Sequence, residues 1–333
     1  MSTSTSNSTS NSNSNSTDFK PNWASEDGSF KRQVSSFRDS IEKGGKFEPE
    51  KGRYHLYVCN ACPWAHRTLI VRKLKGLEDF FDVSYVHPHM LENGWKFAIP
   101  GGKVPSEDFP QATEDKLFGS KYMKEIYFKA DPEYNARYTV PVIWDTKHNT
   151  IVSNESSEII RFLNTAFNDQ LPKEKAELDL YPDELKKEID DLNEWVYPSI
   201  NNGVYRSGFA TTQKAYEEAV TELFGALDRV EGILKDGREY LIGGKLTEAD
   251  VRLYTTIVRF DIVYHGHFKC NLGSIRHDYP ALNRWLKNLY WNNAAFKDTT
   301  DFETSKEHYY FSHKQINGSQ VVPIGPKYPV EPL

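Results

Sequence analysis

The sequence predicts a small α/β domain followed by an all-helical domain. In the first half of the chain, runs of aromatic and β-branched residues alternate with helical patterns. In the second half, long helical patterns dominate residues 184–300. A charged linker at residues 169–183, which contains Pro172 and Pro182, separates the two halves. With 333 residues, the chain is long enough for two such domains.

The first domain is expected to cover residues 51–168. Its first helix is predicted at 63–75, with Pro63 at the first helical position and Gly76 just past the end, where these residue types are favoured. A long loop rich in proline and glycine is expected at 87–120. The other elements expected here are strands at 54–58, 80–86, 140–144 and 150–152 and helices at 122–128 and 155–167.

The second domain is expected to cover residues 184–300 and to contain four long helices. The third of them has a strong start signal, because Thr247 and Asp250 stand three residues apart, as in a capping box. Leu246 and Val251 suit a hydrophobic staple at the same point. The four helices are predicted at 185–196, 214–234, 248–264 and 280–290.

Three further segments flank these domains. Residues 1–17 contain almost nothing but serine, threonine and asparagine, so we expect a disordered tail that cannot bury apolar surface. Residues 18–50 are polar with scattered aromatic residues, which predicts an arm that packs on the body through its rings. Residues 301–333 are predicted to form an extension that wraps the surface.

Composition excludes several classes of protein. The formal net charge of −6 argues against a general nucleic-acid binder, because such proteins need a surplus of basic residues. No run of eighteen apolar residues occurs, so no membrane span is expected. Three cysteines are too few for a disulfide framework, and the N-terminus has no apolar signal core. We therefore expect a reducing compartment, with the cytoplasm as the default.

Cys62 is the candidate nucleophile. It stands just before Pro63, between a predicted strand and a predicted helix, and would therefore be the N-cap residue. Amide donors and the helix dipole favour an anion at this position, which predicts a thiol pKa below the free-cysteine value of about 8.5. The alternative is a buried structural cysteine, which is the commoner role for a lone cysteine. The specific strand–Cys–Pro–helix order favours the nucleophile.

Cys59 and Cys62 also form a Cys-x-x-Cys pair, which suggests a dithiol redox site. In glutaredoxin-like enzymes, however, the second cysteine lies three residues after the nucleophile, where this chain has Ala65. We therefore expect a monothiol site in which Cys59 is mostly structural. A zinc site built from the three cysteines and a histidine near Cys270 is the other alternative. No second closely spaced cysteine pair exists, so no metal is expected.

Two segments suggest a peptide-like ligand with a free amino acid end. Val140-Pro141 precedes a predicted strand, and in a thioredoxin-like fold this proline is cis and leaves the backbone of the preceding residue exposed to pair with glutathione. Ser153-Asn154-Glu155-Ser156 begins a predicted helix, where ordinary capping is one interpretation. In addition, the helix amides can bind a carboxylate and Glu155 an ammonium group. The γ-glutamyl end of glutathione offers both groups.

These residues carry a resemblance to the glutathione transferases over nearly all of residues 50–300. In more detail, the chain resembles the xi class, the glutathionyl-hydroquinone reductases. The Ser/Asn tail and Cys59 depart from the family pattern. The stretches that carry the resemblance are Tyr57–Arg67, Val140–Asp145, Ile151–Ile160, Ile200–Tyr205, Arg259–Tyr264, Gly266–Asn271 and His308–Tyr310, with the Ile-Asn and Val-Pro-Ile-Gly-Pro pieces that follow.

The resemblance implies a thioredoxin-like N-terminal domain, a helical C-terminal domain and a homodimer. It implies Cys62 as the nucleophile and Tyr205, Tyr264 and Tyr309 as the lining of an aromatic substrate pocket, although the sequence does not separate Tyr309 from Tyr310. Taken alone, three tyrosines are more often core or surface residues. The implied contacts with glutathione, the co-substrate, are Trp95, Arg137, Val140, Glu155 and Ser156.

The activity implied is removal of glutathione from glutathionyl-hydroquinones through a mixed disulfide on the cysteine. Two alternatives remain open at this point. One is an omega-like thiol transferase that acts on dehydroascorbate or glutathionylated protein. The other is a non-enzymatic binder that holds aromatic metabolites in the helical cleft. A Cys62→Ser variant separates them, because a binder keeps its affinity whereas either enzyme loses turnover.

Overall fold

A four-stranded mixed sheet forms the base of the first domain. The computed structural model describes residues 25, 27–99, 109 and 111–333, so the predicted tail at 1–17 lies outside it. The strand order is β2-β1-β3-β4. The central strand β1 pairs in parallel with β2 and antiparallel with β3, and β3 pairs antiparallel with β4. The strands are β1 Tyr54–Val58, β2 Phe81–Tyr85, β3 Val142–Asp145 and β4 Thr150–Ser153.

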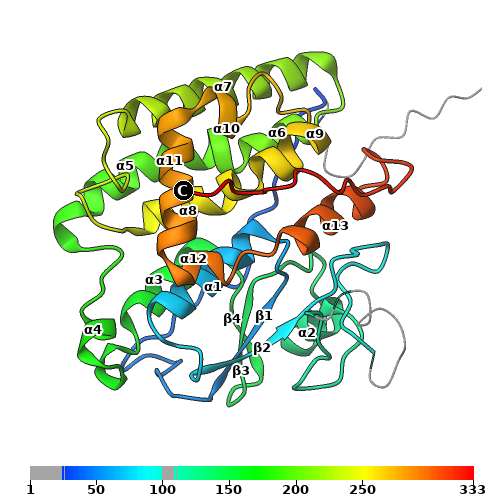
Figure 1. The fold of residues 1–333 in the computed structure, drawn as a ribbon. Coiled ribbons are helices and arrows are strands. Elements are labelled where there is room, and N and C mark those ends of the chain that lie inside the picture. Colours follow the sequence, from blue (N-terminus) through cyan, green and yellow to red (C-terminus); the bar gives the residue numbers. More distant parts are fainter. Residues whose placement is uncertain (1–24, 26, 100–108, 110) are drawn as a thin grey trace, which may run out of the picture.

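Helices cover both faces of this sheet. Helix α1, Pro63–Leu74, lies beside α3, Ser156–Thr165, between the sheet and the helical domain (Figure 1). Helix α2, Met123–Ala130, contacts β4. The predicted end of α1 is confirmed, because Lys75 caps the helix and Gly76 has a φ of 67°, a left-handed conformation that favours glycine.

The second domain is built around helix α8, Glu248–Arg259. All residues of this helix, apolar and polar alike, are buried. The predicted capping box is confirmed: the Thr247 amide donates to Asp250 Oδ2 at 3.0 Å. The longer helices are α5 Lys186–Val196, α6 Gly203–Gly208, α7 Gln213–Leu234, α8 Glu248–Arg259 and α11 Pro280–Asn292. The short turns are Asn168–Gln170, α4 Lys173–Ala176, Asp183–Leu185, α9 His265–His267, α10 Ile275–Asp278 and α12 Ala294–Lys297.

Two π-helical turns interrupt this domain. The predicted single helix at 248–264 is in fact α8 followed by a π turn at Phe260–Tyr264. A second π turn, Tyr197–Asn201, follows α5 and contains Pro198, which has no amide hydrogen to donate within a helix. Such wide turns are frequent at functional sites. The turn Phe260–Tyr264 contains Tyr264 of the predicted pocket. The turn Tyr197–Asn201 contacts the helix Gly203–Gly208, which carries Tyr205.

The C-terminal extension contains a helix that the sequence analysis did not predict. Helix α13, Phe302–Ser312, begins at Asp301, whose side chain accepts from the Thr304 amide at 2.9 Å. Its buried residues include threonine, serine, lysine and histidine, so its inner face does not have an apolar pattern. After α13 the chain crosses the helical domain toward α11, where Trp291 Nε1 donates to the Glu331 carbonyl at 2.9 Å (Figure 1).

The described part of the N-terminal arm is tied to the edge of the sheet. The Asp39 amide donates to the Val152 carbonyl, and the Asn154 amide donates to the Phe37 carbonyl, both at 3.1 Å. Phe30 and Phe47 of the arm are buried in the core. Among the described residues, no helix combines the length and the apolar character that crossing a membrane requires.

Five of the buried histidines make the fold sensitive to acid. His66 shows why they are neutral, because its Nδ1 accepts from the Arg259 guanidinium at 3.0 Å and has no place for a proton. Burial lowers the pKa of all five, to about 4 for His55 and His308 and to about 3 for His267, and well below the usual value for His66 and His313.

We expect the melting temperature to fall as the pH drops from 7 to 5. The folded-state pKa of each histidine lies below its unfolded value of about 6.5, so the unfolded chain binds more protons in acid. The stabilisation is present above that unfolded value and is lost as the pH falls, by up to about 1.4 kcal/mol per histidine and pH unit. Burial raises the pKa of Asp250 to about 6, so this carboxyl stabilises the folded state as the pH falls. It is one group against five histidines. A melting temperature that stays constant or rises over this interval would contradict neutral histidines.

Candidate functional site

Cys62 occupies the N-cap of α1, as the sequence predicts. Strand β1 brings the chain to this point, and Pro63 at the first helical position starts the helix. The side chain is 8% exposed, and its Sγ donates to the Val140 carbonyl at 3.4 Å. The Val140–Pro141 peptide bond is cis, as expected. The structure therefore brings together two segments that the sequence analysis had considered separately.

The predicted depression of the Cys62 pKa is wrong for this structure. Burial raises the pKa of the thiol above its ordinary value. The amides of Ala65 and Trp64, and the guanidinium groups of Arg259 and Arg32, lower it without offsetting the burial. Desolvation of the anion thus outweighs the helix terminus, and the group is held as a thiol that donates to a carbonyl.

Arg259, at the end of α8, fixes the loop that carries the nucleophile. Its Nη2 donates to the Asn60 carbonyl at 2.8 Å and its Nε to the Ala61 carbonyl at 3.0 Å. Its Nη1 donates to the Thr255 carbonyl at 2.8 Å and contacts His66 Nδ1. A buried cation from the helical domain therefore fixes the backbone of the two residues that precede Cys62. Arg259 lies in one of the stretches that carry the family resemblance, but nothing in its local sequence indicates this role.

Glu155 forms the N-cap of α3, which follows β4 directly in the chain. Its Oε1 accepts from the Ser157 amide and hydroxyl, and its Oε2 accepts from the Ser35 hydroxyl of the arm. Burial alone would raise the pKa of Glu155, but these donors and Arg67 hold it below its ordinary value. Ser156 is buried beside Arg67, whose Nη1 donates to its hydroxyl at 3.4 Å. An ionised carboxylate is thus fixed at a helix N-terminus.

Trp95 and Arg137 are held by segments outside the sheet. The Trp95 ring stacks on His308 of α13, with centroids 4.7 Å apart and an interplanar angle of 26°. The Arg137 amide donates to Gln33 Oε1 of the arm at 3.1 Å. Desolvation and, to a smaller extent, the cation of Arg32 lower the pKa of the Arg137 guanidinium.

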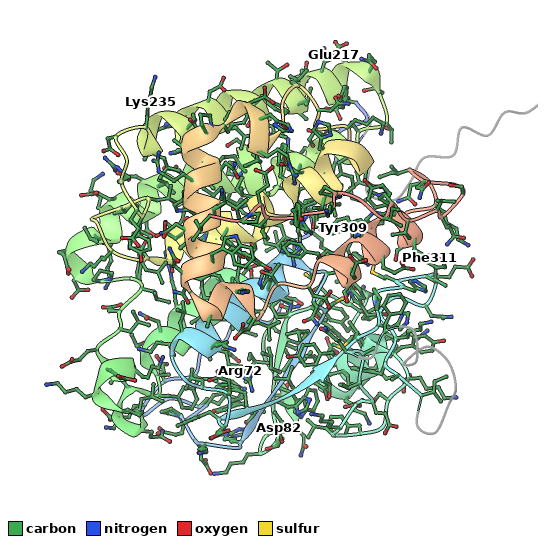
Figure 2. All side chains as sticks on the ribbon, viewed as in Figure 1. Arg72, Asp82, Glu217, Lys235, Tyr309 and Phe311 are labelled. Atoms are coloured by element: carbon green, nitrogen blue, oxygen red, sulfur yellow. The ribbon has the colours of Figure 1, made fainter. Side chains whose placement is uncertain are left out.

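The three predicted pocket tyrosines meet although they lie on three separate elements. The Tyr309 hydroxyl on α13 lies 2.5 Å from the Tyr205 hydroxyl of α6 and 3.1 Å from the Tyr264 hydroxyl of the π turn Phe260–Tyr264. Figure 2 shows Tyr309 between α13 and the helical domain. Tyr310 instead packs on the His267 ring at 4.8 Å. The structure thus joins Tyr309, not Tyr310, to the other two.

These tyrosines are neutral donors. Burial raises the pKa of Tyr205, and raises those of Tyr264 and Tyr309 well above the usual value. Each hydroxyl carries one proton, which it can share with a neighbouring tyrosine or donate to an oxygen of a bound ligand.

Arg32 is a feature of this site that the sequence analysis missed. The carbon of its guanidinium group lies 4.7 Å from the ring centroid of Trp64 and 4.7 Å from that of Tyr205. Its Nε donates to Asn202 Oδ1 at 2.8 Å. Nothing in the polar sequence of the arm marks this arginine, because its role depends on the arm folding back over α1 and α6.

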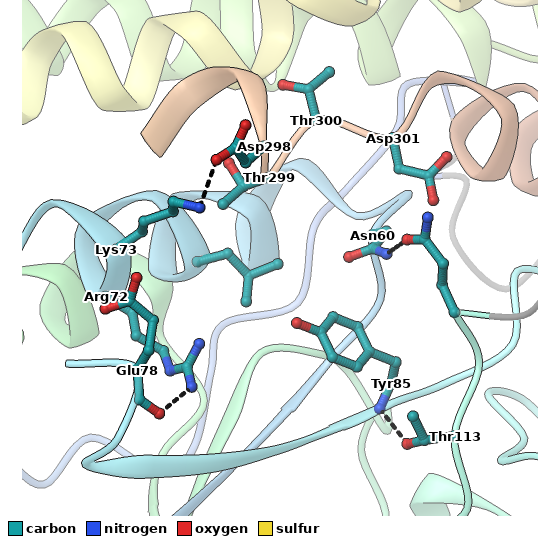
Figure 3. A pocket seen from close by; sticks show the side chains of 12 residues that line it. Asn60, Arg72, Lys73, Glu78, Tyr85, Thr113, Asp298, Thr299, Thr300 and Asp301 are labelled. Atoms are coloured by element: carbon teal, nitrogen blue, oxygen red, sulfur yellow. Dashed lines mark hydrogen bonds and ion pairs between the residues drawn. The ribbon is translucent and has the colours of Figure 1, made fainter. Parts of the chain in front are cut away.

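A pocket of about 440 Å³ opens elsewhere, between α1, β2 and the segment that joins α12 to α13 (Figure 3). An ion pair between Lys73 and Asp298, at 2.7 Å, spans one side, and Asn60 donates to Gln111 on another. None of the predicted site residues lines this pocket. It is therefore separate from the thiol site. Within the described ranges, no three histidine, cysteine or acidic side chains are grouped so as to hold a metal ion.

Comparisons with known proteins agree with this geometry. Residues 61–166 match the glutathione S-transferase N-terminal domain, and residues 213–288 match the C-terminal domain. A crystal structure of the glutathione S-transferase Xi from Phanerochaete chrysosporium is 59% identical, with a TM-score of 0.90 over 93% of this chain and 96% of that one. The chain belongs to the xi class of the glutathione transferases.

Two curated relatives of this xi-class transferase bear different names. Glutathione S-transferase omega-like 2 of Schizosaccharomyces pombe is 56% identical over 92% of this chain and 96% of its own length. Glutathionyl-hydroquinone reductase YqjG of Escherichia coli is 50% identical, with coverage of 91% and 90%. The structure of YqjG with glutathione bound matches with a TM-score of 0.82, at 48% identity, over 89% of this chain and 95% of that one.

We expect alkylation of Cys62 in the xi-class transferase to show a midpoint above about 8.5, since burial dominates its pKa. The measurement is the rate of reaction with a small alkylating agent against pH. Cys59 and Cys270 are fully buried and have raised pKa values, so a Cys62→Ser variant should not be labelled under native conditions. A midpoint below the free-cysteine pKa would show that the helix terminus lowers the pKa of Cys62 by more than desolvation raises it.

Proposed function

We propose that this xi-class transferase is a glutathione-dependent reductase that removes glutathione from glutathionyl-hydroquinones. The observation that carries the proposal is one arrangement: Cys62 starts the helix whose Trp64 ring stacks on Tyr205, and the Tyr205 hydroxyl belongs to a cluster of three neutral tyrosine hydroxyls. A relative with this name at 50% identity supports the same reaction. Once its proton has left, the Cys62 thiolate suits attack on sulfur, and the hydroxyls suit the oxygens of a hydroquinone ring.

In the first step Cys62 attacks the glutathione sulfur of the conjugate. A sulfur–sulfur bond forms, and the bond between that sulfur and the ring carbon breaks, with its electron pair left on the carbon. In the net balance the proton of the Cys62 thiol is transferred to this carbon. The ring is reduced to the hydroquinone, and Cys62 is oxidised to a mixed disulfide with glutathione.

In the second step a free glutathione thiol attacks the mixed disulfide. The products are oxidised glutathione and the Cys62 thiol, so no other reductant is needed. Glutathione would be held by the backbone of Val140, by Glu155 on its ammonium group and by Ser156 at the start of α3 on its carboxylate. Trp95 and Arg137 complete the proposed contacts. The ionised, fixed carboxylate of Glu155 supports this assignment.

The tyrosine hydroxyls would stabilise negative charge on the ring while the carbon–sulfur bond breaks. A preorganised donor placed where charge develops lowers the barrier more than it strengthens substrate binding. Because Tyr205, Tyr264 and Tyr309 are neutral and their hydroxyls already contact one another, little reorganisation is needed.

We also propose that the protein is a cytoplasmic homodimer. The three free cysteines are consistent with a reducing compartment. Gel filtration coupled to light scattering tests the oligomeric state.

An omega-like thiol transferase is the second candidate, because the relative at 56% identity is named omega-like. It shares Cys62 and differs in the substrate. Parallel assays with a glutathionyl-hydroquinone and with dehydroascorbate separate the two functions. Hydroquinone release at least about tenfold more efficient than dehydroascorbate reduction supports the reductase, and the reverse order supports the transferase.

Cys62→Ser should abolish turnover, whereas Cys59→Ser should keep most of it. A serine hydroxyl does not form the mixed disulfide, while Cys59 is buried with a strongly raised pKa and has no step in the cycle. The assay is glutathione-dependent release of hydroquinone. If both variants were equally inactive although folded, a dithiol cycle would replace the monothiol one.

Replacing Tyr205, Tyr264 or Tyr309 by Phe should lower kcat by roughly ten- to a thousand-fold if the hydroxyl stabilises the transition state. A residue that merely positions the ring would raise KM instead. Tyr310→Phe is the matched control, since Tyr310 lies on the same helix but contacts His267. Unchanged release in all three variants would mean that the aromatic pocket lies elsewhere.

A further inference from the structure

Arg32 lies against the stacked rings of Trp64 and Tyr205 with part of its guanidinium group unpaired. Its Nε is used by Asn202, but its Nη2 is buried and has no hydrogen-bond partner in the part of the chain that the structure describes. A buried donor without a partner costs free energy, and one on a charged group costs more than a neutral one. The conformation is therefore suited to a ligand that supplies an acceptor.

The surroundings indicate which kind of acceptor fits. The guanidinium group lies over the faces of Trp64, Tyr205 and Phe30, at 4.7, 4.7 and 5.5 Å from the ring centroids. Aromatic walls favour a flat aromatic ligand. The positive charge of the guanidinium group favours an anion. An aromatic ring that bears an ionised oxygen satisfies both conditions.

The position relative to the thiol agrees with this. Arg32 lies over the ring of Trp64, which is two residues after Cys62 in the first turn of α1, and its cation lowers the pKa of both Cys62 and Tyr205. A ring attached to a sulfur at Cys62 would therefore lie within the field of the Arg32 cation.

We propose that Arg32 donates from Nη2 to the ionised phenolic oxygen of the bound ring and thereby selects aromatic substrates that carry such an oxygen over neutral aryl ethers. The selection of a hydroquinone rests on the proposed function. The competing source of the anion is a carboxylate of glutathione, and the experiment has a separate arm for it.

Binding of 4-nitrophenolate and of 4-nitroanisole to the full-length protein tests the selection without turnover. Arg32→Met should weaken nitrophenolate binding by about ten- to a hundred-fold and leave nitroanisole binding within about twofold. Arg32→Lys should recover part of the loss, because it restores the charge without the planar fork. Arg38→Met is the matched control on the same arm, because Arg38 pairs with Glu158. Equal losses for the two ligands, or no loss for either, would overturn the proposal.

Glutathione binding and thermal melting of the same variants complete the test. Affinity for glutathione should be unchanged in Arg32→Met, and a loss as large as that for nitrophenolate would assign Arg32 to a glutathione carboxylate instead. If the wild-type protein released no hydroquinone but still preferred nitrophenolate through Arg32, the proposed function would fail while the anion selection stood. If it released hydroquinone and Arg32→Met bound nitrophenolate normally, the selection alone would fail.

Discussion

The buried guanidinium of Arg259 joins the two domains at the nucleophile. It donates to two carbonyls of the loop before Cys62 and to the Thr255 carbonyl in its own helix, and it requires an unprotonated nitrogen on His66. A cation satisfied by carbonyls and a neutral imidazole keeps its positive charge available at short range. That charge acts on Cys62, Tyr264 and Tyr309 alike. Domain packing and the electrostatics of the thiol therefore depend on the same side chain.

Two opposing effects decide the state of that thiol. The start of α1 and the two arginines favour the thiolate, while the nearly complete burial of Cys62 favours the thiol, and burial is the larger effect. The same burial keeps the tyrosines protonated. Cys62 and the tyrosines are thus neutral, while the neighbouring arginines carry positive charge. This arrangement is suited to charge that develops only during a reaction.

Segments outside the two domain cores supply much of this site. The N-terminal arm provides Arg32, and Ser35 of the arm fixes Glu155. Helix α13, in the C-terminal extension, provides Tyr309 and also His308, which stacks on Trp95. The two ends of the chain are therefore parts of the site as well as coverings of the domains. A shortened chain that kept only the domains would retain Cys62 and lose Arg32, Ser35, His308 and Tyr309.

The sequence by itself determined the order of the elements, the start and end of α1, the capping box of α8 and the class of the protein. These features depend on local patterns: Pro63 and Gly76, the spacing of Thr247 and Asp250, and the stretch around Cys62. The sequence did not yield α13, because its buried face is polar, or the role of Arg32, because an exposed-looking arginine in a polar arm has no local signal. The choice of Tyr309 over Tyr310 needed the fold as well, since adjacent helical residues point in different directions. The raised pKa of Cys62 was decided by the tertiary structure alone, because burial is a property of everything packed around a residue, not of its neighbours in the chain.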